Sequence, residues 1–210
     1  MFSLLGTPLT AILLLGNLGI SLYALFQDQT LIDRWAFVPN RVQEKGEWYR
    51  LLSGGFLHGG LGHLAFNMIT LYFFGPVLEM VLGSLDFAIV YFGSLLVAHL
   101  FLLAKYKDDP DYVAVGASGA ISGVLFGFCL FFPFEKLYLF FIPIGIPAFL
   151  FAIGFAGYSY WASNQPSRAG VFGRVAHEAH LGGALGGLVL TVLMEPRVLP
   201  GLLRQITNLF

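Results

Sequence analysis

The chain has 210 residues, of which 57% are hydrophobic and 11% are charged, and its mean hydropathy is +0.78. A soluble domain of this length carries about a quarter charged residues, so the composition excludes an ordinary soluble protein and indicates a membrane protein. The formal net charge of -1 provides no basic field for nucleic acid, and we expect no nucleic-acid partner. The single cysteine, Cys129, excludes a disulfide framework.

Six stretches of about 20 mostly apolar residues are predicted to be membrane-spanning helices. The first lacks a basic segment and a small-residue cleavage site, so we expect a retained helix and not a signal peptide. Six helices place both termini on one side. The sequence therefore predicts one all-α polytopic membrane domain over residues 1–210. The predicted helices cover residues 9–26, 61–82, 85–104, 114–133, 137–161 and 178–194.

The long connection over residues 27–60 is rich in charged and aromatic side chains. Trp, Tyr and Arg together favour the membrane interface, so we expect this first loop to be partly embedded among the headgroups. This loop is predicted to lie on the same side of the membrane as residues 105–113 and 162–177. That side carries eight Lys and Arg residues, and the opposite side carries three. The positive-inside rule alone places that side in the cytoplasm.

Polar side chains at membrane depth are costly, so each is a candidate functional residue. His63 and Asn67 are four residues apart and share one face of the second predicted helix. Such a pair either binds a developing anion or joins helices through hydrogen bonds, and the spacing leaves both open. The polar residues at depth are His63, Asn67, Glu79, His99, Ser118, Ser122, His177, Glu178 and His180.

Glycines recur every fourth residue in the fourth and the sixth predicted helices, a spacing that lets two helix backbones approach closely. If these two faces pack together, Ser118 and His180 lie near each other at one membrane depth. The alternative is that the glycines serve packing alone and Ser118 donates its hydroxyl to a backbone carbonyl. The glycines are Gly119, Gly123 and Gly127 in one helix, and Gly182, Gly183, Gly186 and Gly187 in the other.

The fifth predicted helix contains Pro143 and Pro147, together with Gly145 and Gly154. These residues loosen a helix, so we expect it to tilt and admit a substrate laterally, between itself and the second helix.

A serine paired with a histidine can perform nucleophilic catalysis, because neutral histidine takes the hydroxyl proton. Attack on an amide carbonyl creates an oxyanion that needs preorganised donors. The candidate donors are the Ser118 N–H group and the side chains of Asn67 and His63.

Four motifs in this order resemble the rhomboid intramembrane serine proteases: GEWYRLLSGGFLHGGLGHLAFN (46–67), FFGPVLEMVLGS (73–84), GASG (116–119) and AHLGG (179–183). The resemblance implies a six-helix rhomboid-like bundle and a Ser-His dyad that acts without a carboxylate. It also implies cleavage of single-pass or polytopic membrane-protein substrates at or near their transmembrane segments, in the lipid bilayer, with no cofactor and no metal.

The resemblance assigns a role to each matching residue. Ser118 matches the nucleophile, His180 the general base, and His63 and Asn67 the oxyanion pair, with the Ser118 backbone as a further donor. Arg50 matches the arginine of the first loop. The supporting residues that it implies are Arg50, Glu79, Gly116, Gly119 and Gly183.

His177 and Ser122 bear on the choice of the base and on the support of its ring. His177 and His180 are three residues apart, so chemistry alone leaves both open as the base, but only His180 has the following glycine, Gly183, that the family motif requires. Ser122 occupies a position where the family often carries an aromatic residue that stacks on the base. Support for the His180 ring is then expected from Phe126 or from a hydrogen bond to Ser122.

The family orientation places the termini in the cytoplasm and the active site toward the extracytoplasmic side. This orientation contradicts the one that the Lys and Arg count gives, and we adopt the family orientation. The four positive charges of the first loop are matched by four acidic residues, which explains most of the imbalance. We expect a prokaryotic inner membrane.

Three functions other than a serine protease share features with the sequence. The HEAH stretch at 177–180 suggests a zinc protease, but its histidines are three residues apart where H-E-x-x-H requires four. A catalytically inactive rhomboid-like protein that binds membrane clients typically lacks the serine or the histidine, and this chain has both. A transporter with a proton relay through His63, Asn67 and His180 would show paired helix breaks in both halves, which are missing.

Overall fold

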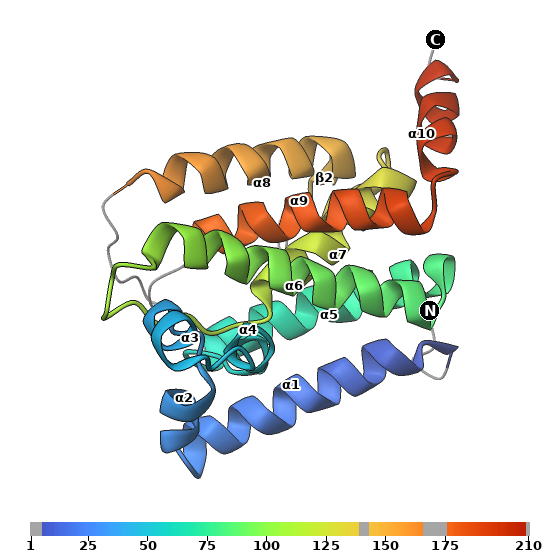
Figure 1. Ribbon diagram of the computed structural model, residues 1–210. Helices are drawn as coiled ribbons and strands as arrows, with labels where there is room; N and C mark the ends of the chain where they lie inside the picture. The colour runs from blue at the N-terminus through green and yellow to red at the C-terminus, as the bar shows by residue number, and fades with distance from the viewer. Residues whose placement is uncertain (1–5, 139–142, 166–175, 209–210) are drawn as a thin grey trace.

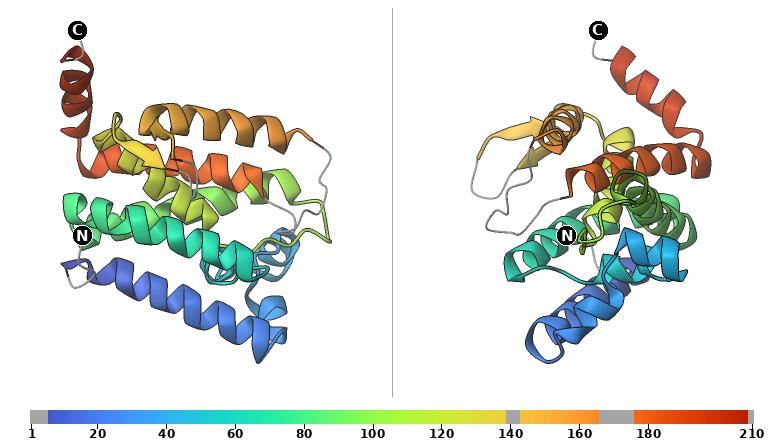
Figure 2. Two further views of the ribbon diagram at one scale, coloured as in Figure 1. Left: turned by 180° about the vertical axis from the view of Figure 1, so that it is seen from behind. Right: turned by 60° about the vertical axis from the view of Figure 1, so that its left-hand side comes forward.

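The computed structural model describes residues 6–138, 143–165 and 176–208, and this part of the chain is mostly helical (Figure 1). Most of the long helices run side by side, with the start of α1 and the end of α9 at the same end of the molecule (Figures 1 and 2). The main helices are α1 (Pro8–Phe26), α5 (Leu61–Leu82), α6 (Ser84–Tyr106), α7 (Ser118–Phe131), α8 (Ala148–Ser163) and α9 (His177–Met194).

Three helices of the described residues, α1, α5 and α6, are long and apolar enough to cross a membrane. A fourth span results if α9 and α10 (Val198–Thr207), which meet at a bend of 101°, count as one. Helix α7 is apolar but has only 14 residues. These helices fit a membrane bundle, and the number of six spans stays a prediction.

Helix α7 lies at the centre of the bundle, packed against α5, α6 and α9. Residues 119–129 are all buried, so every face of this helix meets protein. A helix enclosed on all sides must be apolar all round, which is why its sequence shows no polar face. Its start, Ser118, lies four residues beyond the start of the predicted helix 114–133, because Gly116 has a φ of 131° that no regular helix contains.

The predicted helix over residues 137–161 is wrong in its first half. Strands β1 (Lys136–Tyr138) and β2 (Gly145–Pro147) pair antiparallel there, and α8 begins only at Ala148. Pro147 precedes the helix, so it does not loosen it. A proline lacks the N–H group that a helix interior requires, which favours the extended conformation here.

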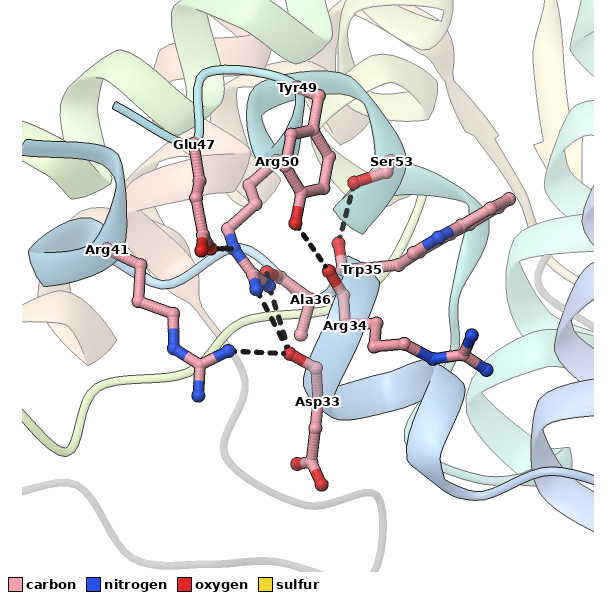
Figure 3. A network of polar contacts seen from close by, with 9 residues as sticks. All are labelled: Asp33, Arg34, Trp35, Ala36, Arg41, Glu47, Tyr49, Arg50 and Ser53. Carbon is pink, nitrogen blue, oxygen red and sulfur yellow. Dashed lines mark hydrogen bonds and ion pairs between the residues drawn. The ribbon is translucent and has the colours of Figure 1, made fainter. Parts of the chain in front are cut away.

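The first loop folds into short helices: α2 (Thr30–Trp35), α3 (Pro39–Lys45), α4 (Arg50–Ser53) and the 3₁₀ turn η2 (Gly54–Phe56). The Arg50 side chain, only 1% exposed, holds them together (Figure 3). Its guanidinium donates to the Ala36 carbonyl at 2.6 Å, to the Asp33 carbonyl at 3.1 Å and to the Glu47 carboxylate. A buried cation requires such partners, and here they fix the path of the loop.

Most of the connection over residues 162–177 lies outside the described residues, including Arg168 and Arg174, which contributed to the Lys and Arg count. Its two flanks are joined by Lys105 at the end of α6. The Lys105 ammonium donates to the Ser163 carbonyl at 3.0 Å and pairs with the Glu178 carboxylate in the first turn of α9.

Candidate active site

One cavity of about 1290 Å³ brings together polar side chains from three helices. His63 and Asn67 of α5, Ser118 and Ser122 of α7, and His180 of α9 all line it. Apart from these residues its wall is mainly apolar, built by Phe, Val, Leu and Ile side chains of α5, α7 and α8. Residues 117 positions apart in the chain, from His63 to His180, thus face one space.

The glycine faces of α7 and α9 pack directly against each other. A Cβ atom on Gly183 would lie 2.0 Å from the Gly119 carbonyl oxygen, and one on Gly187 would lie 2.3 Å from the Gly123 Cα. No side chain fits at these distances. The neighbouring Gly182 and Gly186 instead face α6, where a Cβ would meet Ala98 and Ser94 backbone atoms at 3.1 and 3.2 Å. The sixth predicted helix therefore uses its two glycine pairs for two different partners.

Ser118 is the first residue of α7, and the turn before it is fixed by Gly116. The Gly116 N–H donates to the Gly54 carbonyl at 3.0 Å, and a Cβ on Gly116 would lie 2.6 Å from the Cε1 atom of His63. The His63 ring thus lies directly against the turn that leads to Ser118. The first N–H groups of a helix have no partner within it and point toward its positive end, which suits a developing anion.

His180 is supported by a ring from α8. The Phe155 centroid lies 5.5 Å from the His180 centroid, with the two planes 32° apart. Phe126, one of the two supports expected from the sequence, packs on Phe155 at 6.0 Å and so stands behind the supporting ring. Ser122, the other, is buried and lines the cavity.

His177 lies beside His180 and is not among the residues that line the cavity. Its ring is 5.7 Å from the His180 ring and 5.4 Å from Tyr158, edge to face in both cases. Of the two histidines that the sequence left open as a base, His180 is the one that shares the cavity with Ser118.

Asn67 is 2% exposed, and its amide nitrogen donates to the His63 carbonyl at 2.9 Å, one turn earlier in α5. An amide carries two N–H donors, so one stays available for an oxyanion. The amide borders the cavity, as binding of an anion requires, while its hydrogen bond to His63 lies within α5 and does not join two helices.

His58 is a buried residue next to the site that the sequence reasoning missed. Its ring, 1% exposed, lies 5.0 Å from the His63 ring. The Ser21 hydroxyl donates to the Phe56 carbonyl at 2.8 Å, so its oxygen accepts from the His58 Nδ1–H group, also at 2.8 Å. Burial, and to a lesser degree His63, lower the pKa of His58 to about 3, so the ring is neutral. The available signal was the short spacing between His58, in the loop, and His63, in the first turn of α5.

Glu79 and His99, the remaining polar residues at depth in α5 and α6, have structural partners. The Glu79 carboxylate accepts from the Thr10 N–H and hydroxyl at 2.7 Å, and from the Leu9 N–H at 3.0 Å. It thereby caps the start of α1 from α5. The His99 Nδ1–H group donates to the Leu51 carbonyl at 2.7 Å, which joins α6 to the first loop.

Comparison with known proteins extends the resemblance to rhomboid proteases over most of the chain. The rhomboid domain family matches residues 45–197. The putative rhomboid protease YdcA of Bacillus subtilis is 47% identical over 87 residues, which is 41% of this chain and 42% of that protein. The rhomboid protease GluP of Bacillus subtilis is 32% identical over 148 residues, 70% of this chain and 26% of that protein.

A more distant relative is the mitochondrial rhomboid protein 1 of Saccharomyces cerevisiae, 28% identical over 189 residues, 87% of this chain and 52% of that protein. The matches thus cover between about a quarter and a half of the length of these relatives. Because the family match spans well over half of its residues, this chain belongs to the rhomboid family.

Proposed function

We propose that this protein is an intramembrane serine endopeptidase that uses a dyad of Ser118 and His180. The observation that carries the proposal is the cavity shared by Ser118, His180, His63 and Asn67, which come from three separate helices. A purely structural role would not require polar groups of these four types to border one apolar space, since polar groups at membrane depth are costly. The rhomboid family and its named proteases support the same reading.

In this mechanism the His180 ring removes the hydroxyl proton of Ser118 as its oxygen attacks the carbonyl carbon of the substrate. The negative charge that develops on the carbonyl oxygen is stabilised by the Ser118 N–H group, the Asn67 amide and a His63 ring N–H. The C–N bond then breaks, and protonated His180 gives its proton to the leaving amine. Water, deprotonated by His180, attacks the acyl-enzyme ester. The ester C–O bond then breaks, and His180 returns the proton to the Ser118 oxygen.

The substrate in this proposal is the transmembrane segment of a membrane protein. The walls of the cavity are mainly apolar and are supplied by α5 and α8, which fits a substrate helix that approaches from the lipid between these two helices. We further propose six membrane spans, a prokaryotic inner membrane, cytoplasmic termini and an active site toward the extracytoplasmic side. The second candidate function, an inactive client-binding protein, predicts binding of the same segments without cleavage.

The test is cleavage of a fluorescent transmembrane peptide by the purified protein in detergent micelles, together with labelling by a fluorophosphonate probe. We expect Ser118→Ala and His180→Ala to lower kcat by at least about 10³-fold, and Asn67→Ala to lower it by about 10²-fold. The matched control is Ser163→Ala, because the Ser163 hydroxyl donates to the Tyr160 carbonyl within α8 and Ser163 does not line the cavity.

Retained cleavage in Ser118→Ala would contradict the serine-protease proposal. Loss of cleavage in His177→Ala with retention in His180→Ala would move the base to the other histidine. Peptide binding without cleavage or probe labelling in the unaltered protein would favour the inactive client-binding protein.

A further inference from the structure

Helix α10 leaves the bundle at the end of α9 and runs across the direction of the long helices (Figures 1 and 2). The two helices meet at a bend of 101°. If α9 crosses the membrane, a helix at nearly a right angle to it runs along the membrane plane at the point where α9 ends. The position of α10 is therefore that of a helix at the membrane surface.

One side of α10 is attached to the bundle. Val198 is 4% exposed, and the Gln205 amide nitrogen donates to the Phe131 carbonyl at the end of α7, at 3.0 Å. These two residues are seven positions apart and share a face. This contact accounts for one side of the helix and fixes its rotation about its own axis.

A second side of α10 is apolar and exposed. Leu199, Leu203 and Ile206 follow the spacing i, i+4, i+7, and 44%, 63% and 40% of their surfaces are exposed. Such a spacing forms a continuous stripe along one face. A stripe of exposed leucine and isoleucine beside a bundle of membrane helices has an immediate apolar partner in the lipid.

The third side is basic. Arg197 and Arg204 are seven residues apart, share a face and are both exposed. On a helical projection they lie well over 90° from the apolar stripe. The Arg204 Nε–H group donates to the Pro200 carbonyl at 3.3 Å, and among the described residues the outer nitrogens of its guanidinium have no partner, so they can bind a phosphate. A leucine-rich face and an arginine face on one helix are typical of helices that lie in the membrane interface.

We propose that α10 is an interfacial helix whose apolar stripe lies at the boundary of headgroups and acyl chains, while Arg197 and Arg204 bind the phosphates of anionic lipid headgroups. The partner is the bilayer in which α9 ends, because the bend places the stripe where that bilayer begins. The helix then holds the end of α9 at a fixed depth.

The depth of α10 can be measured by electron paramagnetic resonance, because the chain has a single cysteine, Cys129. In a Cys129→Ala background, a spin label is attached to Leu203→Cys and the full chain is placed in vesicles of phosphatidylcholine and phosphatidylglycerol. The deep reference is Leu185→Cys, an exposed position of α9 about 14 Å before its end. The shallow reference is Asn208→Cys, an exposed position directly after α10, on the side of Arg197 and Arg204.

We expect the label at Leu203→Cys to be accessible to oxygen and shielded from an aqueous nickel reagent, at a depth between the two references. Equal nickel access at positions 203 and 208 would overturn the proposal, since the stripe would then face water. A depth equal to that of Leu185→Cys would show a re-entrant helix. Shielding from both reagents with dipolar broadening would show a second copy of the chain on the stripe.

The role of Arg197 and Arg204 is measured separately, by comparing vesicles with and without phosphatidylglycerol. The mobility of the label at Leu203→Cys should be lower with phosphatidylglycerol than with phosphatidylcholine alone, and Arg197→Gln with Arg204→Gln should abolish this difference. A difference that persists in this double variant would overturn the assignment of the arginines. Probe labelling of Ser118 in each variant reports separately on the active site, so failure of the two proposals can be told apart.

Discussion

Glu79 shows how a single carboxylate can join three elements. Its oxygens accept from Leu9 and Thr10 at the start of α1 and from the Ser84 hydroxyl, at 2.6 Å, at the start of α6. A carboxylate accepts four such bonds without a donor of its own. Glu79, an ionisable residue at membrane depth, is thus fully occupied by the starts of two other helices.

Replacing Glu79 with glutamine places an amide NH₂ group against donors that then lack an acceptor. We expect Glu79→Gln to lower the free energy of unfolding by about 2–3 kcal/mol, the usual cost of losing hydrogen bonds to a charged group. The measurement is an unfolding titration with dodecyl sulfate in mixed micelles. The control is Glu135→Gln at an exposed position, expected to change stability by less than about 0.5 kcal/mol. Equal effects of both variants would contradict the capping role.

His58 makes stability depend on pH, since it lies in the loop before α5 with its pKa lowered to about 3 from 6.5. Between these values the unfolded chain binds a proton at this residue and the folded chain does not. Stability therefore falls as the pH falls from about 6.5 toward 3, by up to about 1.4 kcal/mol per pH unit from this residue.

The matched variant is His58→Gln, whose amide does not titrate and can still donate toward the Ser21 oxygen. We expect unfolding titrations between pH 7 and pH 5 to show a smaller loss of stability in His58→Gln than in the unaltered protein. Parallel pH dependences would mean that His58 is charged or exposed in the folded state, contrary to its 1% exposure.

At the scale of elements, the contact of α7 with α9 permits only glycine at its closest points. A Cβ on Gly183 would overlap the Gly119 carbonyl, 2.0 Å away, and neither backbone can move far, because α7 is enclosed. We expect Gly183→Ala to destabilise the protein by about 1–3 kcal/mol or more and to abolish most peptide cleavage. Dodecyl sulfate titration and the cleavage assay measure the two effects.

Gly154 is the control for this substitution, since it lies within a helix, α8, with no atom within 4 Å of a Cβ built on it. Gly154→Ala should stabilise the protein by about 0.5–1 kcal/mol, because alanine restricts the unfolded chain. If both glycines tolerate alanine equally, the close approach of α7 and α9 is not required for folding.

The sequence predicted the elements whose signal is local. Unbroken apolar runs gave α5 its bounds of Leu61–Leu82 and placed α1, α6 and α9 within a few residues. The pairing of β1 with β2 was missed because this part of the sequence is nearly as apolar as a spanning helix, and only the prolines argued against a helix. Helix α10 was missed because ten residues are too short for a search based on membrane-spanning length.

The residues of the candidate site also divide into those that a local pattern predicts and those that depend on the three-dimensional arrangement. Ser118, His180, His63 and Asn67 were predicted from motifs and spacing, and the structure brings all four to one cavity. Phe155 could not be predicted as the support of His180, because the contact depends on how α8 lies across α9, which no local pattern encodes. The glycine spacing predicted close packing of α7 and α9, while the second contact of α9, with α6, needed the three-dimensional arrangement.

At the scale of the whole molecule, the cavity joins the polar site to a mainly apolar wall that follows α5 from His63 to Val81. A substrate helix on this wall would gain contact far from the bond that is cut. Such remote contacts can stabilise the transition state when they position the scissile bond, so removing them lowers kcat/KM. The shape of the cavity thus predicts that the membrane segment of the substrate, and not the cleaved sequence alone, determines the rate.

This prediction can be checked with two peptides that share one cleaved sequence, of which only one continues into a transmembrane helix. We expect kcat/KM to be at least about tenfold higher for the peptide with the helix, which corresponds to about 1.4 kcal/mol of additional binding. Phe73→Ala, which removes an exposed ring from the α5 wall, should lower kcat/KM for the long peptide and leave the short peptide unaffected. Equal rates for the two peptides would mean that the apolar wall only faces lipid, and the same loss for both in Phe73→Ala would indicate a folding defect.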